Sequence, residues 1–414
     1  MKKFSQKTGF FLVFIMFLGL AVLKTGFTSM AGLKMSQELD VKNDRGQTYR
    51  IPNIKNTAVE LTVKLDKKKR TCLTWKKIPG ADGYEIIRSS KKNGKYQTVK
   101  KIKSGKICRY TDDKASKGER CYYKVRAFRK DIRGISWGKY SRAIDNGVKK
   151  KSDWKITQYG EASGSQMMFY TLQDYHGHLI VVDGGWPQNA EMVRRVLKKK
   201  GGHVNAWILT HPHEDHIGAF CDIYKNPGNI KIDKVYAVEM ASPKLCLDNA
   251  PWDSVTAYQR FRALSISQLK YVHRGDVLKI GKLKIEILSA YEKKIDRLSS
   301  DLLNDGSMVF KVYGKEESML FCADAGKSIS DYLKKKYGSK LKSDYLQMGH
   351  HGNGGLKKNF YKTVNPDVAF FDAPDWLMEG KYGGYTTPRN RKWMEEMGSK
   401  VVSFSTAPNT VVLK

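Results

Sequence analysis

The sequence predicts two domains of different class, a small all-β sandwich followed by a larger α/β domain. A chain of 414 residues is long enough for two or three domains of ordinary size. Residues 57–146 contain short alternating runs separated by turn residues, whereas residues 152–414 alternate apolar strands with helical stretches. The charge changes at the same place, because residues 1–150 carry 37 basic and 12 acidic side chains, or +25 of a net charge of +34.

The composition excludes several classes of protein. With 41% hydrophobic and 11% aromatic residues the chain can bury a sizeable core, so it is neither wholly disordered nor fibrous. A low mean hydropathy and a single long apolar run exclude a polytopic membrane protein. Six scattered cysteines without a C-x-x-C pair argue against a disulfide scaffold and against a cysteine zinc finger.

The positive charge has two interpretations that composition does not separate. It can be a solvated basic surface, or it can attract a polyanion such as nucleic acid, an anionic cell-wall polymer or an acidic membrane surface. Because the excess lies mainly before residue 150, we expect the basic N-terminal region to be the part that meets the cell surface.

The first 31 residues predict an export signal. Three lysines precede an uncharged apolar run of 14 residues, Phe10 to Leu23. A secretory signal takes about 7–15 apolar residues and a membrane span takes about 20. Ser29 and Ala31 supply the small side chains of a cleavage site. An uncleaved N-terminal membrane anchor is the alternative, and in both cases we expect the remainder to be extracellular or at the cell surface. Residues 32–56 are polar and predict a linker.

The first domain, residues 57–146, predicts a β-sandwich. Its strands alternate apolar and polar residues, and Asn93-Gly94 is a strong hairpin signal. Trp75, the Gly83–Ile86 segment and the Tyr123–Ala127 segment resemble the strands of a fibronectin type III domain. That resemblance implies a spacer or adhesion module of exported proteins. No metal-ligand spacing or acid–base cluster occurs here, so we expect the aromatic side chains to be core residues.

The second domain, residues 152–414, begins with an alternation of strands and helices. Leu179 to Val182 predicts a strand that ends at Asp183, and Ala190 to Lys200 predicts a helix stopped by two glycines. Ala206 to Leu209 predicts the next strand. This strand runs directly into a histidine-rich segment.

That segment is the most informative part of the chain, because His211, His213, Asp215 and His216 place four metal-ligand side chains within six residues. Imidazole nitrogen and carboxylate oxygen suit Zn²⁺, and Mn²⁺ or Fe²⁺ also fit them. Three of the nine histidines fall in this hexapeptide, which a chance cluster of ordinary histidines explains poorly. The segment therefore predicts a metal site.

Further ligand candidates follow two later strands. Met319 to Ala323 predicts a strand that ends at Asp324, and Asp344 to Met348 predicts another that leads into His350 and His351. The ends of such strands converge at one edge of a sheet. A carboxylate there can bridge two metal ions that lie about 3.5–4 Å apart.

Together these motifs resemble the metallo-β-lactamase superfamily, which carries H-x-H-x-D-H, an earlier D-G-G, a later aspartate and a final H-H-G. The segments NDGSMVF at 304–310, ADAG at 323–326 and GHHGN at 349–353 more closely resemble the hydrolase domain of ComEC-type competence DNA-uptake proteins. The resemblance implies an αββα sandwich, in which two mixed sheets are covered by helices and a dinuclear metal site lies at one edge.

The resemblance also implies a role for each candidate residue around two divalent metal ions, most simply zinc. The implied roles are His211 and His213 on the first metal, Asp215 and His216 on the second, Asp324 as the bridge, and His350 or His351 completing the second site, with His351 favoured. Asp215 and Asp324 are the candidate catalytic residues. Asp183 matches a buried carboxylate that orients a metal-bound histidine, and a simple turn residue is the alternative.

The chain departs from the family pattern in two places. The further histidine that many members supply before the bridging aspartate is missing, and we expect His273 to be a surface residue. Near the end, a G-H-P motif of the ComEC-type domains is replaced by Thr387-Pro388. We expect Thr387 to cap a helix that has Pro388 at its first position.

The expected function is metal-dependent hydrolysis of a phosphodiester in a polyanion, by a hydroxide shared between two metals. An extracellular nuclease is one version of it, and an esterase that acts on a cell-wall polymer or on phosphocholine is another. An ester or lactam hydrolase is the alternative within the same chemistry. The alternative from another class is a cell-wall-binding adhesin whose hydrolase domain is degenerate, and the intact motifs argue against that.

Overall fold

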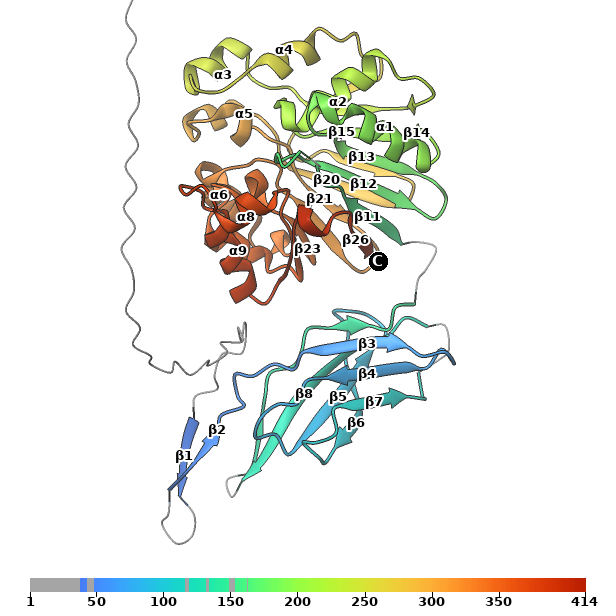
Figure 1. Ribbon diagram of the computed structural model, residues 1–414, viewed down its shortest axis with the longest axis vertical. Coiled ribbons are helices and arrows are strands. Elements are labelled where there is room, and N and C mark those ends of the chain that lie inside the picture. The colour runs from blue at the N-terminus through green and yellow to red at the C-terminus, as the bar shows by residue number, and fades with distance from the viewer. Residues whose placement is uncertain (1–37, 43–47, 116–118, 132–133, 149–152, 162) are drawn as a thin grey trace, which may run out of the picture.

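A computed structural model describes residues 38–42, 48–115, 119–131, 134–148, 153–161 and 163–414 (Figure 1). The predicted export signal, residues 1–31, lies outside this part of the chain. Within the described ranges no helix is long and apolar enough to cross a membrane. A two-stranded hairpin, β1 (Glu38–Lys42) and β2 (Thr48–Pro52), precedes the first domain.

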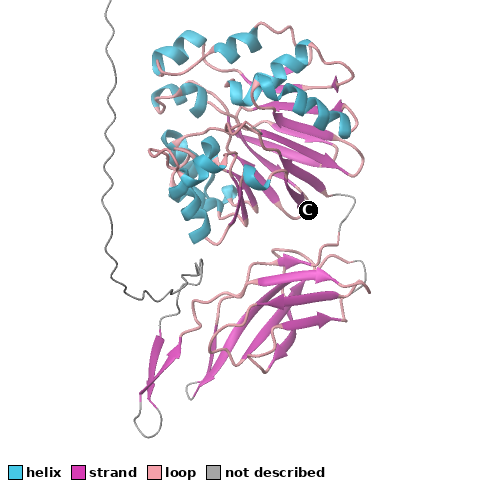
Figure 2. Cartoon of the chain, in the orientation of Figure 1, coloured by secondary structure: helices cyan, strands magenta, loops and turns pink. Residues whose placement is uncertain are grey.

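The first domain packs two antiparallel sheets face to face (Figures 1 and 2). One sheet contains β3 (Leu61–Leu65), β4 (Thr71–Trp75) and β7 (Arg109–Asp112). The other contains β5 (Gly83–Ser89), β6 (Gln97–Ile102), β8 (Tyr122–Asp131), β9 (Gly134–Trp137) and β10 (Ile144–Asp145). The alternating residues of β4 place Leu73 and Trp75 in the core, where the Trp75 ring meets the Tyr84 ring edge-on at 5.2 Å.

The second domain is built on two mixed sheets of seven strands each, with parallel strands at one end and antiparallel strands at the other. The first runs in the order β18 (Leu269–Val272), β17 (Val235–Val238), β15 (Ala206–Leu209), β13 (Leu179–Asp183), β12 (Phe169–Asp174), β11 (Trp154–Gln158) and β26 (Asn409–Leu413). The second runs in the order β19 (Val277–Ile280), β20 (Leu283–Ser289), β21 (Val309–Tyr313), β22 (Ser318–Phe321), β23 (Tyr345–Gln347), β24 (Val368–Phe370) and β25 (Lys400–Val402).

Helices cover the outer faces of both sheets (Figure 1). On the side of the first sheet lie α1 (Ala190–Lys199), α2 (Glu214–Lys225), α3 (Pro243–Asn249) and α4 (Thr256–Arg262). On the side of the second lie α6 (Lys327–Tyr337), α7 (Lys358–Val364), α8 (Asp375–Glu379) and α9 (Thr387–Glu396), and the short α5 (Leu302–Asp305) precedes β21. This is the αββα sandwich that the family resemblance implies.

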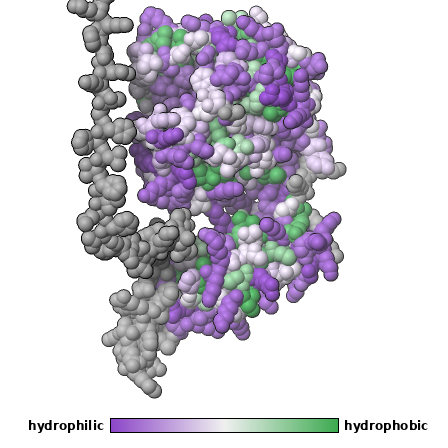
Figure 3. Space-filling view, viewed as in Figure 1, coloured by the Kyte–Doolittle hydropathy of each residue, from purple (hydrophilic) through white to green (hydrophobic). Residues whose placement is uncertain are grey.

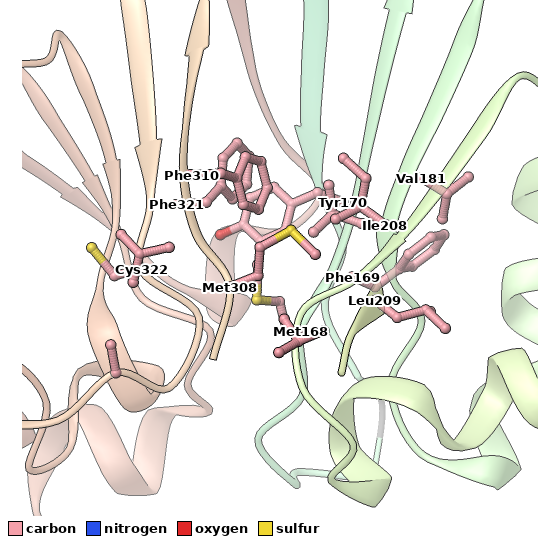
Figure 4. Packing of buried hydrophobic residues seen from close by; sticks show 14 of the residues in the cluster. Met168, Phe169, Tyr170, Val181, Ile208, Leu209, Met308, Phe310, Phe321 and Cys322 are labelled. Carbon is pink, nitrogen blue, oxygen red and sulfur yellow. The ribbon is translucent and has the colours of Figure 1, made fainter. Parts of the chain in front are cut away.

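The core of this domain lies between the two sheets. Figure 4 shows Tyr170 of the first sheet meeting Phe310 and Phe321 of the second, with Met168 and Met308 beside them. The Phe310 and Phe321 rings stack at 4.7 Å, and Tyr170 meets Phe321 edge-on at 5.2 Å. The outer surface in Figure 3 is mostly hydrophilic. The apolar layer therefore fixes the two sheets against each other, so their strand ends form one stable edge.

Buried ion pairs join the two domains. Lys92, beside the Asn93-Gly94 turn of the sandwich, reaches into an acidic site on the second domain. Its Nζ pairs with Asp344, lies 2.8 Å from Asp367 and lies 3.7 Å from Glu317. Other ion pairs cross the same boundary, among them Arg120 with Asp153, Arg142 with Asp367 and Lys414 with Asp145.

One local expectation is wrong by one residue. The N-cap of α9 is Thr386, and Thr387 is the first residue of the helix, with its side chain buried. Thr386 makes no capping hydrogen bond, because its backbone N–H and hydroxyl group face Asn353 and its hydroxyl accepts from the Gly354 N–H at 2.6 Å. The threonine is therefore used to hold the histidine loop rather than to cap the helix.

Candidate metal centre

The H-x-H-x-D-H segment joins the end of β15 to the start of α2. His211 follows the strand, His213 occupies the N-cap position of α2, and Asp215 and His216 lie in its first turn. The N–H groups of Gly184 and Gly185 donate to the His216 carbonyl at 2.8 and 3.1 Å. These bonds fix the loop after β13 to the first turn of α2.

The second sheet brings its own ligands to the same edge. Asp324 follows β22, and His350 and His351 follow β23 in a turn where both histidines have positive φ, 51° and 54°. The side chain of Gln347, at the end of β23, accepts from the N–H groups of Cys322 and Ala323 at 2.8 Å each. It thereby holds the two strand ends together. Left-handed backbone at non-glycine residues is costly and clusters at functional sites.

Four side chains converge on one buried point. The Nε2 atoms of His216 and His351 lie 3.2 and 3.3 Å from the two oxygens of Asp324. His351 Nε2 is also 3.0 Å from Asp215 Oδ2 and 3.4 Å from His216 Nε2. Ligand atoms of one tetrahedral zinc ion lie about 3.3 Å apart, because each is about 2.0–2.1 Å from the metal. The spacing therefore fits a shared cation.

Asp324 has the character of a metal ligand. Its Oδ1 is buried and accepts no hydrogen bond of good geometry, although His216 Nε2 is close. Burial opposes its ionisation, but the neighbouring His351 and His216 outweigh burial and hold the pKa of Asp324 well below its usual range. An ionised, buried carboxylate with an open oxygen requires a positive partner, and a divalent cation supplies one.

His211 and His213 form a second pair of nitrogen donors. His211 Nε2 lies 3.0 Å from His213 Nδ1 and 3.9 Å from Asp324 Oδ2. Burial lowers the pKa of His211 well below its usual value, so its imidazole is neutral and can donate a lone pair. Among the described residues, the ligand atoms of His211, His216 and Asp324 lie within 4.8 Å of one another, and so do those of Asp215, His216 and His351, so both groups could hold a metal ion.

Asp183 orients His216 from behind. Its Oδ2 accepts from His216 Nδ1 at 2.8 Å and from the Thr210 hydroxyl at 2.6 Å, and its Oδ1 accepts from the Thr210 N–H at 2.8 Å. The carboxylate is fully buried and its residue has a φ of 52°. The structure thus places Asp183 both in the turn before Gly184-Gly185 and against the histidine.

His351 is held through the backbone of Asp372. Its Nδ1 lies 3.1 Å from the Asp372 carbonyl oxygen, so the ring donates there and Nε2 is the nitrogen that faces Asp324. The Asp372 carboxylate accepts hydrogen bonds from both sheets, from Gln158, Tyr170 and Gln347. His350, by contrast, has a side chain that is 37% exposed, and its Nε2 is 3.9 Å from Asp324 Oδ2.

Sequence reasoning missed Asp253. Its Oδ2 lies 2.9 Å from His213 Nε2, on the side away from His211. It missed Asp372 as well. Neither residue carries a motif or a periodic signal, because one lies in the irregular loop between two short helices and the other follows a strand of three residues.

Polar side chains lie in the segment before β21, where many family members supply a further histidine. Ser307 stands next to Met308, whose N–H donates to the Thr210 carbonyl at 2.8 Å, directly before His211. The hydroxyl of Ser307 and the Oδ1 atom of Asn304 are buried without a hydrogen-bond partner among the described residues. His273 is a surface residue as expected, with a side chain that is 67% exposed.

Residues 167–232, which contain β12, β13, β15 and the H-x-H-x-D-H segment, match the family model of the metallo-beta-lactamase superfamily. The second domain has the metallo-beta-lactamase fold. A search of curated proteins finds no match.

Parts of this chain are similar to solved structures with which it shares little sequence identity. A mutant of the CmlA beta-hydroxylase is 13% identical with a TM-score of 0.40, and the match covers 63% of this chain and 54% of that one. The long form of RNase Z from yeast is 7% identical with a TM-score of 0.34, covering 53% and 36%. An Fn3-like protein from Clostridium thermocellum is 30% identical with a TM-score of 0.19, covering 22% and 88%. This chain thus spans about half the length of the hydroxylase.

Proposed function

We propose that the metallo-beta-lactamase domain is a dinuclear metal-dependent phosphodiesterase that acts on a polyanion outside the cytoplasm. The observation that supports this most is the gathering of His211, His216 and His351 around one buried carboxylate, Asp324. These residues belong to two overlapping groups of close ligand atoms. Imidazole and carboxylate donors suit zinc, and manganese or iron also fit. His211, His213, Asp215, His216, Asp324 and His351 would hold the two ions.

Two bound divalent ions would supply a water of lowered pKa and polarise the phosphoryl group whose phosphorus is attacked. The side chains around them would handle protons and substrate. Although burial opposes it, His216 and His351 hold the pKa of Asp215 below its usual value, so this carboxylate is ionised and can accept a proton. The partly exposed His350 is placed to donate a hydrogen bond to a bound phosphoryl group.

An exposed aromatic cluster next to the histidine loop favours a substrate with planar bases. The Trp376 ring meets Tyr382 at 5.5 Å and Tyr385 at 5.2 Å, and these tyrosines are 69% and 39% exposed. Tyr385 adjoins Thr386, whose N–H donates to Asn353 Oδ1 at 2.9 Å, two residues beyond His351. Bases stack on such rings without regard to sequence. Nucleic acid therefore fits this surface better than a polymer that lacks planar groups.

The sandwich domain, with its fibronectin type III-like pattern and basic side chains, would hold the enzyme near an anionic cell wall or guide a polyanion toward it. This role is independent of the chemistry. If the second domain proves inert, a cell-wall-binding adhesin is the alternative function of the whole chain.

The test is a hydrolysis screen of the full chain reconstituted with zinc or manganese. The substrates are single- and double-stranded DNA, RNA, bis(p-nitrophenyl) phosphate, a phosphocholine ester and a chromogenic cephalosporin. We expect cleavage of the phosphodiesters, loss of activity in Asp215→Asn and full activity in His273→Ala, which removes a histidine outside the centre. Cleavage of only the cephalosporin would replace this proposal with the lactam hydrolase, and no cleavage at all would favour the adhesin.

A further inference from the structure

Asp253 is fixed in its own loop and points at a proposed metal ligand. It lies between α3 and α4, where its N–H donates to the Ala250 carbonyl at 3.0 Å and its Oδ1 accepts from the Ser254 N–H at 2.7 Å. Its Oδ2 is 2.9 Å from His213 Nε2, and the two side chains are 17% and 14% exposed. The carboxylate is therefore held in place before any ligand binds.

The contact decides which nitrogen of His213 carries the proton. Because a carboxylate accepts hydrogen bonds, Nε2 carries the proton that is donated to Asp253, which leaves Nδ1 as the nitrogen that can bind a metal. Nδ1 faces His211 Nε2 at 3.0 Å.

The facing nitrogen of His211 is left with a lone pair. The Thr210 hydroxyl donates to Asp183 Oδ2 at 2.6 Å, so at 3.3 Å from His211 Nδ1 it can only accept. His211 Nδ1 then carries the ring proton and Nε2 carries the lone pair. When no metal is bound, a proton on His213 Nδ1 closes this 3.0 Å contact, and a bound cation would take the place of that proton. This spacing is close to that of two nitrogens bound to one zinc ion.

We propose that Asp253 is a positioning residue for the first metal, which fixes the donor tautomer of His213 and makes its Nδ1 a stronger ligand. The proposal rests on the dinuclear centre proposed above but not on which bond that centre cleaves. The first site has only two histidines, His211 and His213, because the further histidine of many family members is missing. The orientation of His213 by Asp253 is therefore more important for this site than it would be with a third histidine. The five histidines outside the centre or beside it, His176, His178, His203, His273 and His350, are all partly or largely exposed.

The test is a stepwise zinc titration of the metal-free full chain against a competing chromophoric chelator. In Asp253→Ala we expect one of the two zinc equivalents to bind about 10–100-fold more weakly while the other keeps its affinity. Asp253→Asn keeps an acceptor oxygen without the charge, so it should lie between Asp253→Ala and the wild type. With the two-metal protein, kcat should fall and KM should stay the same.

Two matched controls separate this role from general damage. Asp233→Asn alters an exposed carboxylate that pairs with His203 Nε2 at 2.7 Å, and Trp252→Ala alters the exposed neighbour of Asp253 in the same loop. Both should bind two equivalents normally. Wild-type affinity for both equivalents in Asp253→Ala, or an equal loss at both sites in Asp253→Ala and Asp253→Asn, would overturn the proposal. A wild-type chain that binds no zinc would overturn the dinuclear centre itself.

Discussion

At the scale of single residues, three histidine side chains of the metal centre are each fixed by a hydrogen bond to a residue behind them. His216 is held by Asp183, His351 by the Asp372 carbonyl and His213 by Asp253. Each of these contacts occupies one ring nitrogen and leaves the other free to face the centre. The arrangement is therefore ready for metal before metal arrives, which reduces the ordering that binding requires.

The two adjacent histidines His350 and His351 should behave differently when replaced. His351 lies 3.0 Å from Asp215 and 3.3 Å from Asp324, whereas His350 is 3.9 Å from Asp324 and more exposed. We expect His351→Ala to weaken metal binding by about 10–100-fold or more. His350→Ala should keep both metals and lose activity through weaker substrate contacts. Metal analysis and kinetics of the two variants check this, and metal loss only in His350→Ala would reverse the assignment.

At the scale of elements, the first turn of α2 depends on close packing against the loop after β13. Gly218 lies where this loop crosses the helix, and a Cβ there would stand 2.4 Å from Pro187 Cδ and 2.6 Å from Pro187 N. The latter atom is backbone, so it cannot move aside as a flexible side chain would. Any side chain at this position must shift the turn that carries Asp215 and His216.

We expect Gly218→Ala to destabilise the protein by about 1–3 kcal/mol, the usual cost of an overpacked site. It should also weaken metal binding, because the ligand turn moves. Gly228→Ala is the control, since its φ is 55° and nothing lies near a Cβ there, so it pays only for backbone strain. Denaturant unfolding and metal titration of both variants measure the two effects. Unchanged metal affinity in Gly218→Ala would show that the turn tolerates the shift.

Much of this element-scale structure follows from local pattern. The strand at 206–209 and the helix from Ala190 are found where the sequence predicts them, because apolar runs and stopping glycines act over a few residues. Long-range contacts escape such reasoning. Asp253 contacts His213, which lies 40 residues earlier in the chain. Thr386 bonds to Asn353 instead of capping its helix. Nothing local in the sequence marks either contact.

At the scale of the whole molecule, the sandwich domain and the metal centre lie at opposite ends of the same strands. Asp344 precedes β23, and its Oδ2 accepts from the N–H of Ser318, the first residue of β22, at 2.7 Å. Lys92 of the sandwich pairs with this same Asp344. At their other ends β22 and β23 lead to Asp324 and His351. The sandwich therefore braces the strands that carry the metal ligands.

Lys92→Met should be strongly destabilising. Asp344, Asp367 and Glu317 would lose the cation that they share. Removing one partner of a buried ion pair commonly lowers the free energy of unfolding by about 3–5 kcal/mol. Lys91→Met, at an exposed neighbouring position, is the control and should change little. Denaturant unfolding of the full chain gives both values.

The same ion pairs predict that a fragment of residues 152–414 is less stable than the full chain. Equal stability of the fragment and the full chain would show that the interface contributes nothing.

The interface should also weaken in acid. Burial opposes ionisation of Asp367, but Lys92 and Arg142 outweigh it and hold the pKa of this carboxyl below its usual value. A lowered pKa in the folded state gives stability that is present above the unfolded value of about 3.9 and is lost as the pH falls through the folded value. Melting curves between about pH 5 and about pH 2, in about half-unit steps, should fall less steeply for Asp367→Asn than for the wild type. Identical slopes would show that Asp367 is not perturbed.

We propose that this chain holds two metal ions that share Asp324. The most direct measurement is the metal content of the purified full chain after saturation with zinc and removal of the excess, for the wild type and for Asp324→Asn. We expect about two equivalents in the wild type and less than about one in the variant, because the shared anionic ligand supports both ions. One equivalent or none in the wild type, or two equivalents retained in Asp324→Asn, would contradict the claim.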